Sequence, residues 1–156
     1  HKDLDYRPKI ALYQPDIPQN TAAIIRTCSC FDLRLEIIKP VGFVLDEKKL
    51  KRIYMDYVKN CKIIYHKSFD EFMKIKRKGC IILFTTKSKS RYYEFQFKKG
   101  DTLLFGNESN GVNQSVHNTI KDKLNIPIKT ENRSLNLSSA VSIAASEALR
   151  QINFSN

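Results

Sequence analysis

The chain has 156 residues, 42% of them hydrophobic, so it can bury one substantial core but leaves no room for a second globular domain. Lysine and arginine number 27 against 16 acidic residues, and the formal net charge of +11 would attract a polyanion such as RNA, DNA or an acidic membrane surface, although basic residues also serve plain solubility. No apolar run approaches the roughly 20 residues that cross a bilayer and the first residues lack a signal-peptide pattern, so the sequence predicts a cytoplasmic protein.

The cysteines and histidines do not form a metal-binding pattern. None of the cysteines forms a C-x-x-C pair, and His66 and His117 lie at unrelated spacings. We therefore expect no metal site. Cys61 and Cys80 open apolar runs, where a free thiol usually behaves as a small buried hydrophobe.

Short runs rich in Ile, Leu, Phe and Tyr predict β-strands. Several runs are continuously apolar rather than alternating, as expected for strands buried on both faces. In chain order the predicted strands are residues 10–13, 35–38, 61–65, 80–85, 102–105 and 124–128.

Segments with helical spacing of apolar residues separate most of these strands. Asn20 and Asp46 can each cap a helix. Ser68 and Glu71 fit a capping box, in which each side chain satisfies a backbone N–H at the start of a helix, and Gly79 suits the end of that helix.

Two further helices are predicted in the second half of the chain. Asn113 starts a short one that reaches Lys121. The last helix runs from Leu137 and presents mostly small side chains along one face, with Ser134 or Asn136 as its cap.

Strands that alternate with helices indicate an α/β fold, here one domain over residues 1–156 with a mainly parallel sheet and helices on both faces. Ligands bind such sheets beyond the carboxyl ends of the strands, so we expect the site in the loops at 14–20, 85–90, 106–111 and 129–136. The glycines form neither G-x-G-x-x-G nor G-x-x-x-x-G-K-[ST], which argues against the ordinary dinucleotide and P-loop sites.

The candidate site residues in these loops each have a plain structural interpretation as well. Asn20 and Arg26 lie in QPDIPQNTAAIIRTC, where they could be only a cap and a solvated charge. Glu108 lies in LLFGNESNGV. A plain turn explains the small residues of this segment, but it explains the carboxylate among them less well. Ser134 and Asn136, in ENRSLNLSS, could simply cap the last helix.

Three segments together resemble the ordered motifs of the SpoU branch of the SPOUT RNA methyltransferases: PDIPQNTAAIIRTC, LLFGNESNGV and LNIPIKTENRSLNLSSAVSIAASEALRQ. The chain is most similar to the small tRNA (cytidine or uridine at position 34) 2'-O-methyltransferases, and the resemblance extends over nearly its whole length. It implies a C-terminal deep trefoil knot, S-adenosylmethionine as cofactor, the tRNA anticodon stem-loop as partner, and a homodimer in which both chains build each active site.

The resemblance also implies residue roles. The catalytic residues would be Asn20, Arg26, Glu108, Ser134 and Asn136, and the cofactor contacts would fall at Phe84, Gly106, Ile126 and Ser134. A guanidinium is effectively always protonated, so we expect Arg26 to stabilise the forming alkoxide or clamp an RNA phosphate rather than act as a base.

The chain departs from the family pattern at several positions. Asp32 stands where a glycine is common, and Asn107 and Asn110 replace a usual proline and arginine. In the last helix Ser146 and Leu149 replace a usual tyrosine and tryptophan.

Two other functions stay open at the level of sequence. One is 2'-O-methylation of another tRNA position or of ribosomal RNA. The other is a non-catalytic RNA-binding module of the same fold. In either case the cations of KSKSRYY, residues 87–93, could contact phosphates beside two stacking tyrosines, or could be a solvated loop.

Overall fold

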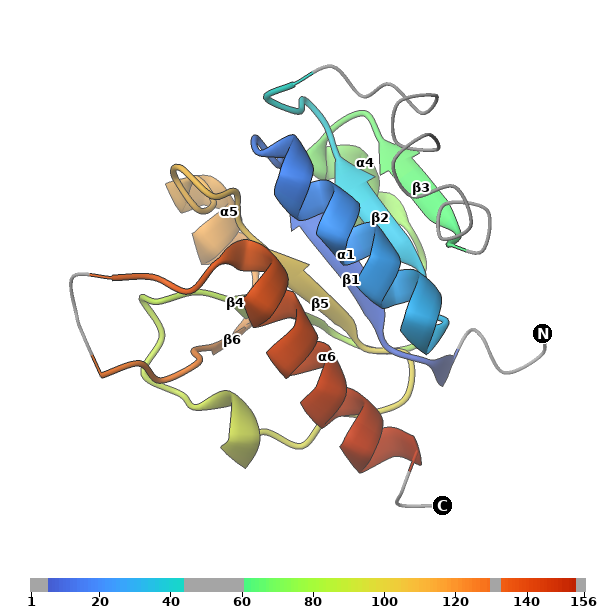
Figure 1. The fold of residues 1–156 in the computed structure, drawn as a ribbon, viewed down its shortest axis with the longest axis vertical. Coiled ribbons are helices and arrows are strands. Elements are labelled where there is room, and N and C mark those ends of the chain that lie inside the picture. Colours follow the sequence, from blue (N-terminus) through green and yellow to red (C-terminus); the bar gives the residue numbers. More distant parts are fainter. Residues whose placement is uncertain (1–5, 44–60, 130–132, 154–156) are drawn as a thin grey trace.

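A parallel sheet lies at the centre of the molecule, between two layers of helices (Figure 1). The computed structural model describes residues 6–43, 61–129 and 133–153. The strands are β1 Lys9–Tyr13, β2 Leu35–Ile38, β3 Ile63–His66, β4 Ile81–Phe84, β5 Thr102–Phe105 and β6 Asp122–Leu124. They lie in the order β3-β2-β1-β5-β4-β6, and neighbouring strands are parallel. The predicted α/β class is therefore confirmed.

Both faces of the sheet are covered by helices, as predicted. Helices α1 (Pro18–Phe31) and α6 (Leu137–Asn153) lie side by side on one face, while α4 (Phe69–Lys74) and α5 (Gln114–Thr119) cover the other (Figure 1). A short 3-10 helix, η2 (Tyr92–Glu94), follows β4.

The alternation of side chains along a strand builds two apolar cores. Ile10 and Leu12 of β1 pack in the core beneath α1 and α6, and Ala11 and Tyr13 pack in the core beneath α4 and α5. Burying one such Leu or Ile side chain contributes about 1.5–3 kcal/mol. Strands buried on both faces read as continuous apolar runs, which is why the sequence identified them.

The boundaries of β2 and β5 match the predicted strands, but the last predicted strand is wrong. β6 spans Asp122–Leu124 and ends where the predicted strand begins. Phe84, the last residue of β4, pairs with Leu124, so no residue of β4 remains to pair with 125–128. Pro127 also lacks the N–H that a strand ladder uses.

Helix α1 begins earlier than predicted, and Asn20 is not its cap. Ile17 occupies the cap position and Pro18 follows as the first helical residue, where the fixed φ of proline is already helical. The helix ends at Asp32, whose φ of 57° lies in the left-handed region. That conformation favours glycine but is open to aspartate, which accounts for Asp32 at this position.

The Ser68 half of the predicted capping box of α4 and the Asn113 cap of α5 are confirmed, and the predicted ends of the two helices are not. The Glu71 N–H donates to Ser68 Oγ at 3.1 Å, and the Val116 N–H donates to Asn113 Oδ1 at 2.9 Å. Helix α4 ends at Lys74, well before Gly79, and α5 ends at Thr119 rather than Lys121.

Some expectations concern single residues. Gly79 serves close packing instead of ending a helix, because a Cβ there would lie 2.4 Å from the Gly100 carbonyl carbon. Cys61 is buried as predicted, whereas Cys80 is exposed. The helix predicted after Asp46 lies outside the described residues. None of the helices in the described parts of the chain is both long and apolar enough to span a bilayer.

Candidate active site

A cavity of about 640 Å³ opens beyond the carboxyl ends of the central strands. Each of the four loops predicted to hold the site contributes to its wall, through Asn20, Thr85, Gly106 and Ser134 among others. Apolar side chains from the strand ends and from the segment after β6 complete the lining. The cavity therefore lies where the sequence predicts the site.

At the cavity, the backbone just after β5 folds back so that the two ends of a short loop lie close together. Asn107 and Gly111 exchange backbone hydrogen bonds of 3.0 Å in each direction, which closes the loop that carries Glu108. A Cβ on Gly106 would lie 2.5 Å from the Gly111 carbonyl carbon, so only glycine fits there. Gly111 itself has a φ of 67° and open space beside its Cα. This closed loop holds Glu108 at a fixed place on the rim.

The Glu108 carboxylate joins the loop after β1 to the start of α1. Its Oε1 accepts from the Asp16 N–H at 3.2 Å, and its Oε2 accepts from the Ile17 N–H at 3.2 Å and from Asn20 Nδ2 at 3.1 Å. Helix α1 has no side-chain cap of its own. Glu108 therefore binds, from a distant part of the chain, the two residues that lead into α1 and one side chain of its first turn, where a negative charge is favoured.

Asn136 extends this network to α6. Its Nδ2 donates to Asn20 Oδ1 at 2.9 Å, while its Oδ1 accepts from the Ser139 N–H at 3.2 Å. Asn136 thus caps α6, one of the two predicted caps. The chain Glu108, Asn20, Asn136 fixes the starts of two helices relative to each other, with each amide orientation set by its partner.

A second carboxylate stands beside this network. Ser109 Oγ donates to Asp16 Oδ2, and this hydrogen bond, against a smaller opposing effect of burial, holds the pKa of Asp16 below its ordinary value. Asp16 is only partly buried, so the shift carries little weight for stability.

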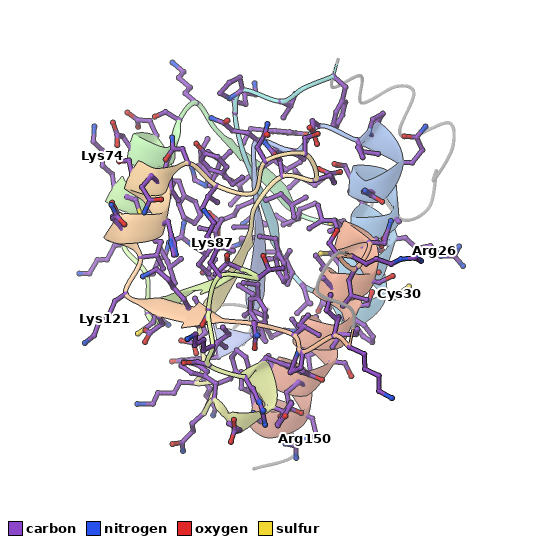
Figure 2. The ribbon with its side chains drawn as sticks, turned by 90° about the vertical axis from the view of Figure 1, so that its left-hand side faces the viewer. Arg26, Cys30, Lys74, Lys87, Lys121 and Arg150 are labelled. Carbon is purple, nitrogen blue, oxygen red and sulfur yellow. The ribbon has the colours of Figure 1, made fainter. Side chains whose placement is uncertain are left out.

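Four of the five predicted catalytic residues border the cavity: Asn20, Glu108, Ser134 and Asn136. Arg26 does not line the cavity of its own chain. It is exposed on α1, and Figure 2 shows its side chain pointing away from the sheet, on the same side as Cys30. A single chain therefore does not bring Arg26 to the other four residues.

The predicted cofactor contacts all lie in the cavity wall: Phe84, Gly106, Ile126 and Ser134. Their spread over several loops is what a ligand enclosed between loops requires.

Sequence reasoning missed other parts of the wall. His117 lines the cavity from α5, and both of its ring nitrogens are shielded and lack a hydrogen-bond partner in the structure. Lys87 lines it from the loop after β4. Nothing in the spacing of His117 points to a site, whereas Lys87 falls in the loop at 85–90, where the sequence predicts part of the site without singling out this residue.

A parallel sheet with a polar-rimmed cavity at the carboxyl ends of its strands defines a ligand-binding α/β domain of the kind found in enzymes. The chain belongs to the SpoU rRNA methylase family, whose sequence profile matches residues 7–146. The resemblance inferred from the three motifs is therefore confirmed.

Individual relatives agree with this assignment. A Beijerinckia indica protein named tRNA (cytidine(34)-2'-O)-methyltransferase is 38% identical over 145 residues, which cover 92% of this chain and 91% of that protein. A solved structure described as giving insights into the 2-OH methylation of C/U34 on tRNA is 38% identical, has a TM-score of 0.87, and matches 94% of this chain and 97% of its own.

The fold is shared more widely. A SpoU methyltransferase from Streptomyces viridochromogenes, solved in complex with AdoMet, has a TM-score of 0.82 at 21% identity, over 94% of this chain and 58% of that one. At this identity the likeness concerns the fold alone.

Proposed function

We propose that the chain transfers the methyl group of S-adenosylmethionine to the ribose 2'-oxygen of the wobble nucleotide, cytidine or uridine at position 34, of tRNA. The observation that carries the proposal is the match over 92% of the chain to a relative named for methylation at that position. The cavity rim, with its carboxylate and paired amides, offers hydrogen-bonding groups suited to a ribose. A tRNA substrate makes the cytoplasm the expected location.

The cavity suits S-adenosylmethionine in size and lining. Its volume of about 640 Å³ lies within the range of small-molecule sites. Phe84 and Ile126 would pack against the apolar face of the adenosine, while backbone groups near Gly106 and the Ser134 hydroxyl would hydrogen-bond to its polar atoms. When bound, this cofactor supplies an electrophilic methyl group on a positively charged sulfur.

The Glu108 carboxylate contributes charge as well as position. Each of the three donors that contact it is a neutral N–H, so these hydrogen bonds do not cancel its negative charge. A negative charge on the rim favours a sulfonium in the cavity. Glu108 also fixes the amide of Asn20, which we propose binds the ribose.

Positioning is the main contribution that these residues make to the reaction. Methyl transfer requires the ribose oxygen to lie in line behind the methyl group, and a displacement of about 1 Å can cost about 100-fold in rate. The linked amides of Asn20 and Asn136, held by Glu108 and by the first turn of α6, supply rigid contacts for that alignment.

We propose that Arg26 acts in the cavity of a second copy of the chain. It lies on the outer side of α1, next to α6, where the exposed surface includes small side chains such as Ser146. Thr27 and Ser142 contact each other across the two helices at 3.4 Å. Such a surface allows the helices of another chain to approach closely, and a homodimer would then present Arg26 to the partner's ribose or phosphate.

Co-expression of two inactive variants tests this arrangement. Arg26→Ala removes the guanidinium, and Ser134→Trp fills the cavity from an exposed position. If Arg26 acts across the dimer, each mixed dimer contains one intact site and a statistical mixture recovers about a quarter of wild-type turnover. A mixture without activity, from variants that still dimerise, contradicts the proposal.

We further propose that the chain forms the deep trefoil knot typical of SPOUT proteins. Residues just after β6 contact the segment after β4, since the Asn125 N–H donates to the Ser90 carbonyl at 2.7 Å and the Tyr92 N–H donates to the Asn125 carbonyl at 2.9 Å. These contacts bring the two segments side by side, which a knot that threads one past the other requires. Pulling the termini apart in a single-molecule experiment would leave a shorter extended length than an unknotted chain gives.

The activity itself is tested with labelled S-adenosylmethionine and bulk tRNA, followed by mapping of the methylated nucleotide. We expect label on the ribose of nucleotide 34. Label on a base, at another tRNA position or only in ribosomal RNA contradicts the proposed substrate. Failure to bind S-adenosylmethionine in calorimetry would instead favour a non-catalytic RNA-binding module.

A further inference from the structure

The basic segment after β4 is fixed to the outer margin of the sheet. The Leu124 carbonyl of β6 accepts from the Thr85 N–H at 2.9 Å and therefore faces β4. Because successive residues of a strand face opposite neighbours, Lys123 and Asn125 face outward. Their outward groups bind the segment: Ser88 Oγ donates to the Lys123 carbonyl at 2.8 Å, and Asn125 exchanges backbone hydrogen bonds with Ser90 and Tyr92.

The other end of the segment is attached to α6. The Phe97 N–H donates to Gln151 Oε1 at 2.8 Å, and Gln151 Nε2 donates to the Phe95 carbonyl at 2.9 Å. The Phe97 ring is buried and stacks on Phe84 with centroids 6.5 Å apart. The segment is thus held at both ends and does not behave as a loose solvated loop.

This attachment separates the roles of two adjacent tyrosines. Tyr92 packs against the large apolar core, whereas Tyr93 is 49% exposed. The two rings meet edge to face at 5.5 Å, and Arg91 Nη1 donates to the Tyr93 hydroxyl at 3.2 Å. Tyr93 is therefore an aromatic face held in a fixed position with a guanidinium beside it.

Positive charge dominates the exposed surface of the segment. Its exposed charged residues are Lys87, Lys89, Arg91, Lys98 and Lys99, against the single acid Glu94. We name the surface formed by residues 87–99 the basic ridge. Lys87, at one end of the basic ridge, also lines the cavity, so the ridge begins at the mouth of the candidate active site.

We propose that the basic ridge binds the RNA substrate, with its cations on phosphates and Tyr93 stacked on an unpaired base next to the methylated nucleotide. The inference rests on the proposed function and assigns the surface that delivers the ribose to the cavity. An exposed aromatic ring among cations suits single-stranded RNA, whose unstacked bases and phosphates use both features.

The test measures binding of a labelled anticodon stem-loop RNA by fluorescence anisotropy. We expect Tyr93→Ala to weaken the affinity about 5- to 100-fold, and Tyr93→Phe to keep it within about 2-fold, because stacking needs the ring and not the hydroxyl. Lys67→Ala is the control, since Lys67 is also exposed but follows β3, at the opposite margin of the sheet.

Salt dependence tests the cations separately. In the double variant Lys87→Ala and Lys89→Ala, we expect the slope of log affinity against log salt to fall by about 0.7 for each lost phosphate contact. Binding of S-adenosylmethionine by Tyr93→Ala, measured by calorimetry, should match wild type and shows that the variant is folded.

The outcomes separate this inference from the proposed function. A wild-type chain that binds S-adenosylmethionine but no tRNA overturns both. Wild-type tRNA binding that is matched by Tyr93→Ala and by the double lysine variant overturns only the basic ridge as an RNA surface, and would favour another partner for it, such as an acidic protein.

Discussion

Two glutamates of this protein each accept several hydrogen bonds, and they do so in opposite electrostatic settings. Glu36 of β2 is 2% exposed, and the charged guanidinium of Arg77 donates to it from Nη1 and Nη2, each at 2.8 Å, while His66 Nε2 lies 2.6 Å from its Oε1. Among the residues that the structure describes, Glu108 on the cavity rim accepts its hydrogen bonds from neutral N–H groups, and the carboxyl group of Asp16 lies beside it.

The difference shows which polar cluster serves the fold and which serves the site. The Arg77 guanidinium also lies 4.3 Å from the centre of the Phe72 ring and donates to Thr102 Oγ1, so the charge of Glu36 is enclosed and compensated. Such a group cannot act on a ligand. Glu108 lies next to a cavity, and its hydrogen bonds from neutral groups fix where its carboxylate lies.

Loss of the compensating cation should have the largest effect. We expect Arg77→Ala to lower the free energy of unfolding by about 3–5 kcal/mol, because it leaves the buried Glu36 carboxylate without its bidentate partner. Urea denaturation at neutral pH measures this. Arg150→Ala is the control, since Arg150 pairs with Glu147 at the surface, where solvent screens the pair, and its loss should cost far less. Equal losses in both variants would contradict the contrast.

At the rim, the effect should fall on turnover more than on stability. Glu108→Gln keeps the shape but turns an N–H toward the backbone N–H groups that the carboxylate accepts from. We expect methyl transfer to fall about 100-fold through misplacement of Asn20, while the free energy of unfolding falls by about 1–3 kcal/mol. Asp70→Asn, on the exposed side of α4, should change neither. A folded Glu108→Gln enzyme with normal turnover would refute the role assigned to Glu108.

The pH dependence of stability sharpens the contrast at Glu36. Burial raises the pKa of Glu36, but the hydrogen bonds and charges of Arg77 and His66 outweigh it and hold the pKa below the ordinary value of 4.5. A lowered pKa means that the stabilisation is complete above that value and is lost as the pH falls below it.

Wild type should therefore be more stable than Glu36→Gln at neutral pH, and the two should converge as the pH falls below 4.5. Burial raises the pKa of Asp101, which acts in the opposite sense, but this contribution cancels in the difference between the two proteins. A difference that stays constant between neutral and acidic pH would contradict the prediction. Glu71→Gln provides an exposed control.

The smallest effect is expected from removing the hydrogen bond between Ser109 and Asp16, which lies beside Glu108 on the cavity rim. Ser109→Ala removes the hydroxyl that donates to Asp16, so the pKa of Asp16 should rise toward its ordinary value. Because both residues are partly solvated, we expect a stability loss of about 0.5–1.5 kcal/mol and a turnover change below about 5-fold. An NMR titration of Asp16 and a turnover assay measure both. A loss as large as that of Glu108→Gln would mean that the whole rim, and not Glu108, sets the geometry.

Sequence patterns predicted the sheet well because burial leaves a direct record in the chain. The runs at β2 and β5 are apolar on both faces and gave correct boundaries. The prediction of β6 failed because this strand is short and partly polar. Its limits are set by pairing with β4, and a local sequence pattern carries no information about that pairing.

The candidate site was predictable because most of its residues lie in loops that follow the predicted strands. Asn20, Glu108, Ser134 and Asn136 follow strands of one parallel sheet or border their loops, so the topology brings them together. The Glu36 cluster was not predictable, because Glu36 sits inside the apolar run LEII, and its partners join it only through the pairing of β2 with β3 and the segment after α4. The position of Arg26 depends likewise on the side of α1 that the sheet leaves uncovered.

The segment that occupies the outward hydrogen-bonding groups of Lys123 and Asn125 has a consequence for solubility. A short terminal strand with free amides is a template on which a strand from another molecule can grow. Here those groups are already engaged by Ser88, Ser90 and Tyr92. Substitutions that detach this segment should therefore make the protein prone to fibrillar self-association before they unfold it.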